Sequence, residues 1–254
     1  MAAAARGSPE ALDLFAVCAP GVEPFAAAEL RALGVEPRAQ ETGGLAFTGS
    51  REVLYRANLH LRTVSRVIAR VGAFSALNFA ELERRARREP WERWIAPGRA
   101  VRLRVTCRKS RLYHSDAVAE RLARAIAARL GRDVHADVAV REEDDAGDAQ
   151  LVIARVAHDR CTLSVDSSGA LLHARGYRLA TAKAPLRETL AAALLAASGW
   201  DARAPLLDPF CGAGTIAIEG ALIARTIAPG LARRFAFMEW PDFDRALWTR
   251  LVDE

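Results

Sequence analysis

The residues best suited to chemistry lie in a glycine-rich turn, which reads LLDPFCGAGT from Leu206 to Thr215. Gly212 and Gly214 allow the backbone to bend sharply and let a ligand approach it closely. A helix is expected to begin near Thr215, and its first N–H groups are unpaired and lie at the positive end of the helix dipole. The turn is therefore suited to bind a phosphate or a carboxylate.

Three kinds of ligand compete for this turn. A Walker A loop needs Gly-Lys-Ser/Thr, and the segment contains no lysine, so we exclude it. A dinucleotide fingerprint of the form G-x-G-x-x-A spans Gly212 to Ala217, but the carboxylate of Asp208 opposes a pyrophosphate. The same carboxylate suits S-adenosylmethionine, which carries a cationic ammonium and sulfonium and a carboxylate that can face the helix. We favour S-adenosylmethionine, and a dinucleotide or a purely structural turn stays open.

A strand before the turn and a helix after it must hold it in place. We expect a short strand at 205–207 and a helix from about Thr215 to Ala224. Upstream, a helix is expected to begin at Pro185 and to end at Gly199. Its predicted apolar stripe comprises Leu186, Leu190, Ala193, Leu194 and Ala197. Strand, glycine turn and helix in this order are typical of the start of a nucleotide-binding α/β domain.

The earlier part of the chain mixes strands and helices. Strands are expected at 12–17, 44–48, 64–74, 101–105, 151–156 and 161–165, with the last two forming a hairpin pair. The spacing of apolar residues predicts helices near 22–33, 51–61 and 115–130. This pattern fits a mixed α+β region better than a parallel sheet. We therefore divide the chain into an N-terminal region at 1–166, a connector at 167–184 and a C-terminal region at 185–254.

Basic residues are concentrated between Glu81 and His114. This segment holds eleven arginines and lysines against four glutamates, so its local charge exceeds the net charge of +5 of the whole chain. Phosphate contacts supply most of the nonspecific affinity for nucleic acids, which makes the segment a candidate RNA-binding surface. The candidate contacts are Arg102, Arg104, Arg108, Lys109, Arg111 and His114, and in the connector Arg175, Arg178 and Lys183. A solvated basic face, and a packing role for the connector residues, are the alternatives.

Composition excludes several other classes of protein. With 51% apolar residues, the chain can form a substantial core. The four cysteines fit neither a zinc motif nor a disulfide framework, so we expect no metal site and a reducing, cytoplasmic location. No apolar stretch approaches the roughly 20 residues needed to cross a bilayer, so no membrane association is expected.

Several strings in the chain resemble a known family. DPFCGAGTIAIEGALIA, IAPGL and RRFAFMEWPDFD resemble the UPF0020-type RNA methylases, which are class I S-adenosylmethionine-dependent methyltransferases preceded by a THUMP domain. The upstream strings GLAF, YRANL, RTVSRV, SVDSSG, LHARGYR and APLRETLAA are similar to the N-terminal region of bacterial 23S rRNA guanine-N2 methyltransferases. The resemblance covers essentially the whole chain, with the strings in the same order.

This resemblance implies a fold, a cofactor and a partner. The implied fold is an α+β RNA-binding region of ferredoxin-like and THUMP type, followed by the start of an α/β Rossmann-like methyltransferase domain. The implied cofactor is S-adenosyl-L-methionine, and the implied partner is RNA, with rRNA preferred to tRNA. The residues implied to line the methionine end of the cofactor are Asp208, Phe210, Gly212, Gly214 and Thr215, with Cys211 contributing mainly its backbone.

The chain also departs from the family pattern. The family carries a second acid for the ribose and an Asn/Asp-Pro-Pro-Tyr/Phe motif for the target base, and neither is found before Glu254. We therefore assign no catalytic residue and expect a truncated enzyme that is inactive without its C-terminal half, which becomes an expected partner. The alternative is a stand-alone THUMP RNA-binding protein without catalysis. The family often has Arg where Ala174 stands and usually Ser where Ala213 stands.

Overall fold

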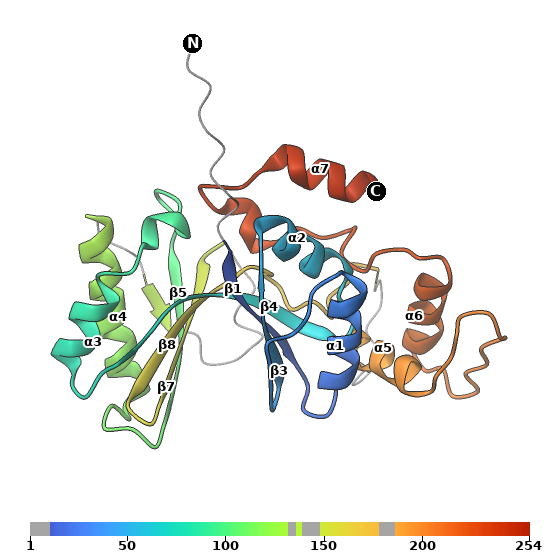
Figure 1. The fold of residues 1–254 in the computed structure, drawn as a ribbon, viewed down its shortest axis with the longest axis horizontal. Helices are drawn as coiled ribbons and strands as arrows, with labels where there is room; N and C mark the ends of the chain where they lie inside the picture. Colours follow the sequence, from blue (N-terminus) through green and yellow to red (C-terminus); the bar gives the residue numbers. More distant parts are fainter. Residues whose placement is uncertain (1–10, 132–135, 139–147, 178–185) are drawn as a thin grey trace, which may run out of the picture. The chain divides into compact units, whose positions relative to one another are not determined.

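The computed structural model describes residues 11–131, 136–138, 148–177 and 186–254 (Figure 1). The chain forms two compact units. The first unit comprises residues up to Val67, Leu172–Arg233 and Arg245–Glu254, and the second comprises Ile68–Leu171 and Arg234–Asp244. Each unit thus combines stretches that are far apart in the sequence.

The first unit begins with strands and two helices. The strands are β1 (Leu12–Cys18), β2 (Ala39–Glu41), β3 (Gly44–Gly49) and the start of β4 (Val64–Ser75), in the order β2-β3-β1-β4. The helices are α1 (Glu23–Ala32) and α2 (Arg51–His60), and the hydroxyl of Ser50 accepts a hydrogen bond from the N–H of Val53 at the start of α2. Leu14, Leu45 and Phe47 are fully buried, so the alternating strands and the amphipathic helices share one core.

The later stretches add three helices to the first unit. These are α5 (Glu188–Ala197), α6 (Thr215–Ala224) and α7 (Arg245–Asp253). Helices α5 and α6 pack on each other, and α7 packs on α2, where the rings of Tyr55 and Trp248 meet edge to face at 6.1 Å. The C-terminal helices are therefore part of the same compact unit as the N-terminal sheet.

The second unit contains the rest of β4 and four more strands. Its strands β5 (Val101–Arg108), β6 (Ala136–Val138), β7 (Gln150–Ala157) and β8 (Arg160–Asp166) are arranged in the order β4-β8-β7-β5-β6. β7 and β8 form the expected hairpin, and β5 runs parallel to both β6 and β7. Helices α3 (Phe79–Ala86) and α4 (Ser115–Leu130) pack together, and short 3-10 helices lie at Trp91–Arg93 and Ala236–Glu239. The mixed sheet with helices confirms the predicted α+β region.

Two predictions for the C-terminal region are wrong. Residues 205–207 are not a strand, and the side chains of Leu206 and Leu207 are 39% and 85% exposed. A strand needs a neighbouring strand to pair its backbone groups, and in the described ranges every strand belongs to the sheet order given above. Helix α5 begins at Glu188, not at Pro185.

Of the apolar stripe predicted for this helix, Ala193 is buried, but Leu186, Leu194 and Ala197 are exposed. The buried face of α5 also carries Ala191, Ala192 and Leu195, whereas Leu194 is 52% exposed. The helix is apolar almost all round, so its sequence alone does not determine which face packs. None of the helices in the described ranges is both long and apolar enough to cross a membrane.

Candidate functional site

The glycine turn leads directly into helix α6. Gly212 and Gly214 have φ angles of +53° and +73°, which are in the left-handed region that favours glycine. Gly214 caps α6, and its N–H donates to the carbonyl of Cys211 at 2.7 Å. A Cβ atom at either glycine has no close neighbour, so the backbone conformation, and not lack of space, requires glycine here.

The structure brings the six predicted cofactor residues together around the N-terminus of α6. Asp208 accepts a hydrogen bond from the N–H of Phe210 at 3.2 Å, and the ring of Phe210 is 94% exposed. Cys211 and Gly212 are exposed, and Thr215 is buried in the first turn of the helix. Exposed backbone N–H groups at a helix N-terminus can bind a carboxylate, and the Asp208 carboxylate can attract a cation.

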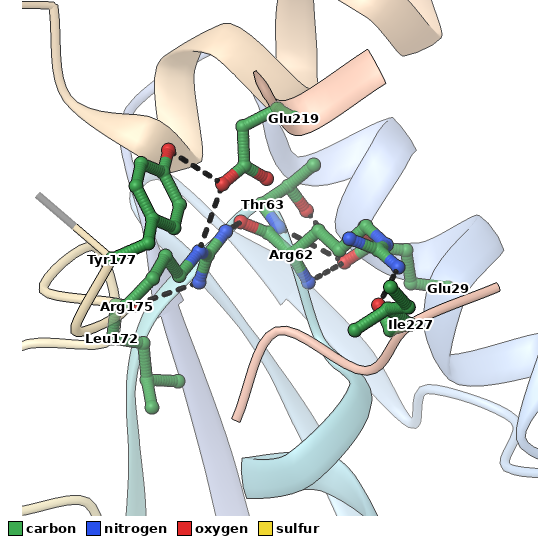
Figure 2. A network of polar contacts seen from close by, with 8 residues as sticks. All are labelled: Glu29, Arg62, Thr63, Leu172, Arg175, Tyr177, Glu219 and Ile227. Carbon is green, nitrogen blue, oxygen red and sulfur yellow. Dashed lines mark hydrogen bonds and ion pairs between the residues drawn. The ribbon is translucent and has the colours of Figure 1, made fainter. Parts of the chain in front are cut away.

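A buried polar network lies one helical turn beyond this N-terminus (Figure 2). Its centre is Glu219 of α6, whose side chain is fully buried. Oε1 of Glu219 is 3.4 Å from Nε of Arg175 and accepts a hydrogen bond from the hydroxyl of Tyr177 at 3.1 Å. The guanidinium of Arg175 also donates to the carbonyls of Leu172 and Arg62. The network therefore joins α6 to the connector and to the start of β4.

A second carboxylate extends the network toward α1. Oε2 of Glu29 accepts from the N–H groups of Arg62 and Thr63, both at 3.1 Å, and from the Thr63 hydroxyl at 2.8 Å. The Arg62 guanidinium donates to the carbonyl of Ile227, which lies just after α6. Two carboxylates thus balance two guanidinium groups within the buried network.

Burial governs the protonation of these groups. It raises the pKa of Glu29, although the hydrogen bonds from Thr63 and Arg62 oppose this shift. Burial and the nearby charge of Glu219 raise the pKa of Tyr177. Oε2 of Glu219 and Nη1 of Arg62 are buried without a hydrogen-bond partner in the described part of the chain. The hydrogen bonds that the other atoms of these groups make are therefore needed to offset the free-energy cost of removing the charged groups from water.

The sequence prediction missed this network and misassigned Arg175. Arg175 was predicted to contact RNA, but it is only 4% exposed and its guanidinium is engaged by protein groups. Its packing role, the alternative considered for the connector, is the one the structure supports. One feature of the sequence does indicate the network, namely that Glu219 is the single charged residue of α6. An acid in an apolar helix indicates a buried partner.

The other predicted RNA contacts fall in three groups. Arg102 and Arg104 are half-buried on β5, where they alternate with the buried Val101 and Leu103, and both already interact with other groups. Four residues are exposed in the loop that follows β5 or at its end, namely Arg108, Lys109, Arg111 and His114. Arg178 and Lys183 lie outside the residues that the structure describes.

The loop after β5 also presents an aromatic residue, Tyr113, that the prediction did not include. Tyr113 is 68% exposed, and its ring lies 4.0 Å from that of His114. The loop is held at Asp159, whose carboxylate accepts from the N–H of Arg111 at 2.7 Å and whose N–H donates to the hydroxyl of Ser110. An exposed ring beside three cations has the composition of surfaces on which single-stranded nucleic acids stack.

No group of potential metal ligands lies among the residues that the structure describes. The thiols of Cys18 and Cys161 are buried, which raises the pKa of each to about 12 and makes them unreactive. Cys211 is exposed in the glycine turn. The candidate chemistry of the chain therefore rests on the turn and on the basic surfaces.

Family models match three successive parts of the chain. The RlmL ferredoxin-like domain matches residues 13–68, the THUMP domain matches 76–166, and the "RMKL-like, methyltransferase domain" of UPF0020 matches 175–251. A "Putative RNA methyltransferase slr0064" from Synechocystis is 40% identical over 240 residues, covering 94% of this chain and 62% of the relative. The "Ribosomal RNA large subunit methyltransferase K/L" of Syntrophotalea carbinolica is 37% identical over 248 residues, covering 96% and 34%.

Solved structures share the same fold. A "predicted N6-adenine-specific DNA methylase" from Listeria monocytogenes aligns with a TM-score of 0.83 at 35% identity, covering 96% of this chain and 63% of that one. "SMU.472, a putative methyltransferase complexed with SAH" aligns with a TM-score of 0.82 at 32% identity, covering 97% and 64%. The chain thus spans between a third and two thirds of the length of these proteins. Along its length the chain therefore resembles, in order, an RlmL ferredoxin-like domain, a THUMP domain and the UPF0020 methyltransferase domain.

Proposed function

We propose that this chain forms the RNA-binding part and the cofactor turn of an S-adenosylmethionine-dependent RNA methyltransferase. The observation that carries the proposal is the left-handed glycine turn at the start of α6, preceded by the carboxylate of Asp208. Relatives named as RNA methyltransferases and a similar structure that contains S-adenosylhomocysteine support it. Of the possible targets, we propose the exocyclic N2 amine of a guanine in 23S rRNA.

The turn is suited to hold the methionine end of the cofactor. Of the Asp208 carboxylate, Oδ1 accepts the hydrogen bond from Phe210, and Oδ2 can receive the cofactor's ammonium. The cofactor's carboxylate can face the N-terminal N–H groups of α6. When bound, the cofactor supplies a methyl group already activated by its sulfonium, so the task of the protein is alignment. The target base has to leave its stack to reach such a pocket.

The apolar side chains around the turn support a larger domain than the described helices form. Leu207 is 85% exposed, Phe210 94% and Leu194 52%. Leu207 and Phe210 lie three residues apart in the same turn, and neighbouring exposed apolar side chains can mark an interaction site. We propose that further parts of the methyltransferase domain cover this face, with the remaining C-terminal half as the partner.

RNA is proposed to contact the second unit at the loop after β5. Arg108, Lys109 and Arg111 are exposed there and can neutralise phosphates. His114 and the half-buried Arg102 and Arg104 extend the basic surface. The connector residues Arg178 and Lys183 remain proposed contacts.

A second candidate function is RNA binding without catalysis. The segment before the turn is not a strand, so one wall of the expected cofactor pocket is not formed among the described residues. On this alternative, the glycine turn is structural and the chain binds RNA alone.

Cofactor titration separates the two functions. We would titrate S-adenosylhomocysteine by calorimetry into the chain alone and into the chain mixed with the C-terminal half of a relative. The first function predicts binding that the added half strengthens and that D208N weakens at least tenfold, whereas D253N, an exposed aspartate at the end of α7, leaves it unchanged. Nucleoside analysis of 23S rRNA after methylation by the reconstituted pair then identifies the product. Absence of cofactor binding in both samples would leave only the RNA-binding function.

A further inference from the structure

A depression on the second unit is lined mainly by arginine. It lies between α3 and α4, has a volume of about 840 Å³, and is separate from the loop after β5. The residues that line it are Phe79, Ala80, Glu83, Arg84, Arg87, Arg88, Arg121 and Arg129. Five guanidinium groups and one carboxylate thus face the same space, so the depression attracts anions.

Three of these arginines lie at the C-terminal end of α3, with Arg84 in the last turn of the helix and Arg87 and Arg88 in the turn that follows it. Arg87 and Arg88 follow Arg84 by three and four residues, a spacing that places side chains together on a helix. Like charges at this spacing destabilise a helix by a few tenths of a kcal/mol each. Within the described ranges, no side-chain hydrogen bond or ion pair links any of the three to a carboxylate. No protein carboxylate in these ranges therefore offsets the repulsion among the three guanidinium groups, and a bound anion would reduce it.

The two arginines on α4 differ, because each already has a carboxylate partner. Arg121 lies 3.6 Å from Glu83, and Arg129 contacts both carboxylate oxygens of Glu92. These ion pairs fix the far wall of the depression. Arg84, Arg87 and Arg88 are exposed on the near wall, so they are the groups available to bind.

One face of the aromatic ring at this site is already covered by a cation. The guanidinium of Arg121 lies over the ring of Phe79 at 5.7 Å, so that face of the ring is occupied. The chemistry of the depression therefore favours phosphate over nucleobases. Arginine binds phosphate oxygens with two parallel hydrogen bonds, which lysine cannot do.

We propose that this arginine depression binds the phosphate backbone of RNA, as a second contact distinct from the loop after β5. The inference rests on the proposed RNA-binding function of the chain. It predicts a sequence-independent contact, because hydrogen bonds from arginine to phosphate oxygens carry no information about the bases. The second unit, which matches the THUMP domain, then contacts RNA at two places.

The test compares three variants by fluorescence anisotropy with a labelled single-stranded oligouridylate and with an RNA duplex. R84Q/R87Q/R88Q removes the three available cations. R84K/R87K/R88K keeps the charge, and R31Q/R38Q/R250Q removes three exposed, ion-paired arginines from the first unit as a matched control. Far-ultraviolet circular dichroism and a thermal melt establish that each variant is folded, which is expected because none of the substituted side chains is buried.

The glutamine variant should bind RNA at least tenfold more weakly at low salt. Each phosphate contact adds about 0.7 to the slope of log K against log salt for single strands, so loss of three contacts should reduce the slope by about 2. The control should keep the slope of the unmodified chain, and the lysine variant most of it. Unchanged affinity and slope in the glutamine variant overturn this proposal while the RNA-binding function stands. If the unmodified chain binds neither RNA, both fail. Displacement of RNA by polyglutamate as readily as by polyphosphate assigns the depression to acidic proteins instead.

Discussion

At the scale of single residues, the glycine turn makes a specific demand on Gly214. Its φ of +73° is disfavoured for a residue with a Cβ atom, but asparagine adopts this region more readily than alanine. We expect G214A to lower the free energy of unfolding by about 1 kcal/mol and G214N by less. Urea unfolding followed by fluorescence measures both. Equal losses for the two variants would show that the backbone conformation is not the cause.

Glu219 supports a second prediction at this scale. Removing one member of a buried ion pair leaves the other uncompensated and costs about 3–5 kcal/mol. E219A should therefore destabilise the chain by roughly 3 kcal/mol, and Y177F, which loses one hydrogen bond, by about 1 kcal/mol. The double variant E219A/Y177F should lose less stability than the sum of the two single losses. The reason is that each single substitution already removes the hydrogen bond between the Tyr177 hydroxyl and Oε1 of Glu219.

The control for this network is E36A, which removes an exposed ion pair with Arg31 and should change stability little. If E219A proves as mild as E36A, the network does not hold α6 in place. Strict additivity of E219A and Y177F would instead argue that the hydrogen bond between them does not form in solution.

The residues of the turn could be predicted from the sequence, but the network could not. Gly212, Gly214 and Asp208 act within one short segment, so their spacing carries the information. Arg175 and Glu219 are 44 residues apart, and Arg175 and Arg62 are 113 apart. Only the folded chain brings such residues together, which is why Arg175 was mistaken for a surface cation.

At the scale of elements, alternation and capping predicted the α+β region well. The β7–β8 hairpin and α4, which ends at the left-handed Gly131, lie where the sequence placed them. These elements find their partners close by or carry strong end signals. The expected strand at 205–207 does not form, because a strand in a parallel sheet takes its stability from neighbours that local sequence does not supply.

The exposed apolar residues in and after the segment 205–207 allow a further prediction at the scale of elements. Because Leu207 and Phe210 are 85% and 94% exposed, L207S/F210S should change the free energy of unfolding by no more than about 0.5 kcal/mol per residue. F237A, at a fully buried ring, should cost about 3–5 kcal/mol. The double serine variant should also bind less of an apolar dye such as ANS. A large loss of stability in L207S/F210S would mean that these side chains are covered in solution.

At the scale of the whole molecule, the candidate cofactor turn belongs to the first unit, whereas the loop after β5 and the arginine depression belong to the second. The first unit unites the ferredoxin-like strands with α5, α6 and α7. The network centred on Glu219 links α6 to the connector and to the residues just before β4. The linear boundaries at 166 and 184 remain a prediction. Boundaries drawn along the sequence cannot describe the first unit, because contacts between distant residues join its three separate stretches of chain.

This assembly should make the first unit sensitive to acid. His60 and His173 both belong to it, and burial lowers the pKa of each, with Arg56 adding to the effect at His60 and Arg187 at His173. A histidine whose pKa is lower in the folded state contributes stability above its unfolded pKa of about 6.5, and this stability is lost as the pH falls.

We therefore expect the chain to lose stability between pH 7.5 and 5.5, and H60Q/H173Q to lose less over the same interval. Urea unfolding at the two pH values measures the difference, and H158Q, at an exposed position in the β7–β8 turn of the second unit, is the control. Glu29, whose pKa burial raises, acts in the opposite sense but is present in every variant, so the difference between the variants reports on the histidines. An identical acid loss in H60Q/H173Q and in the unmodified chain would mean that neither histidine is held in its neutral form by the folded first unit.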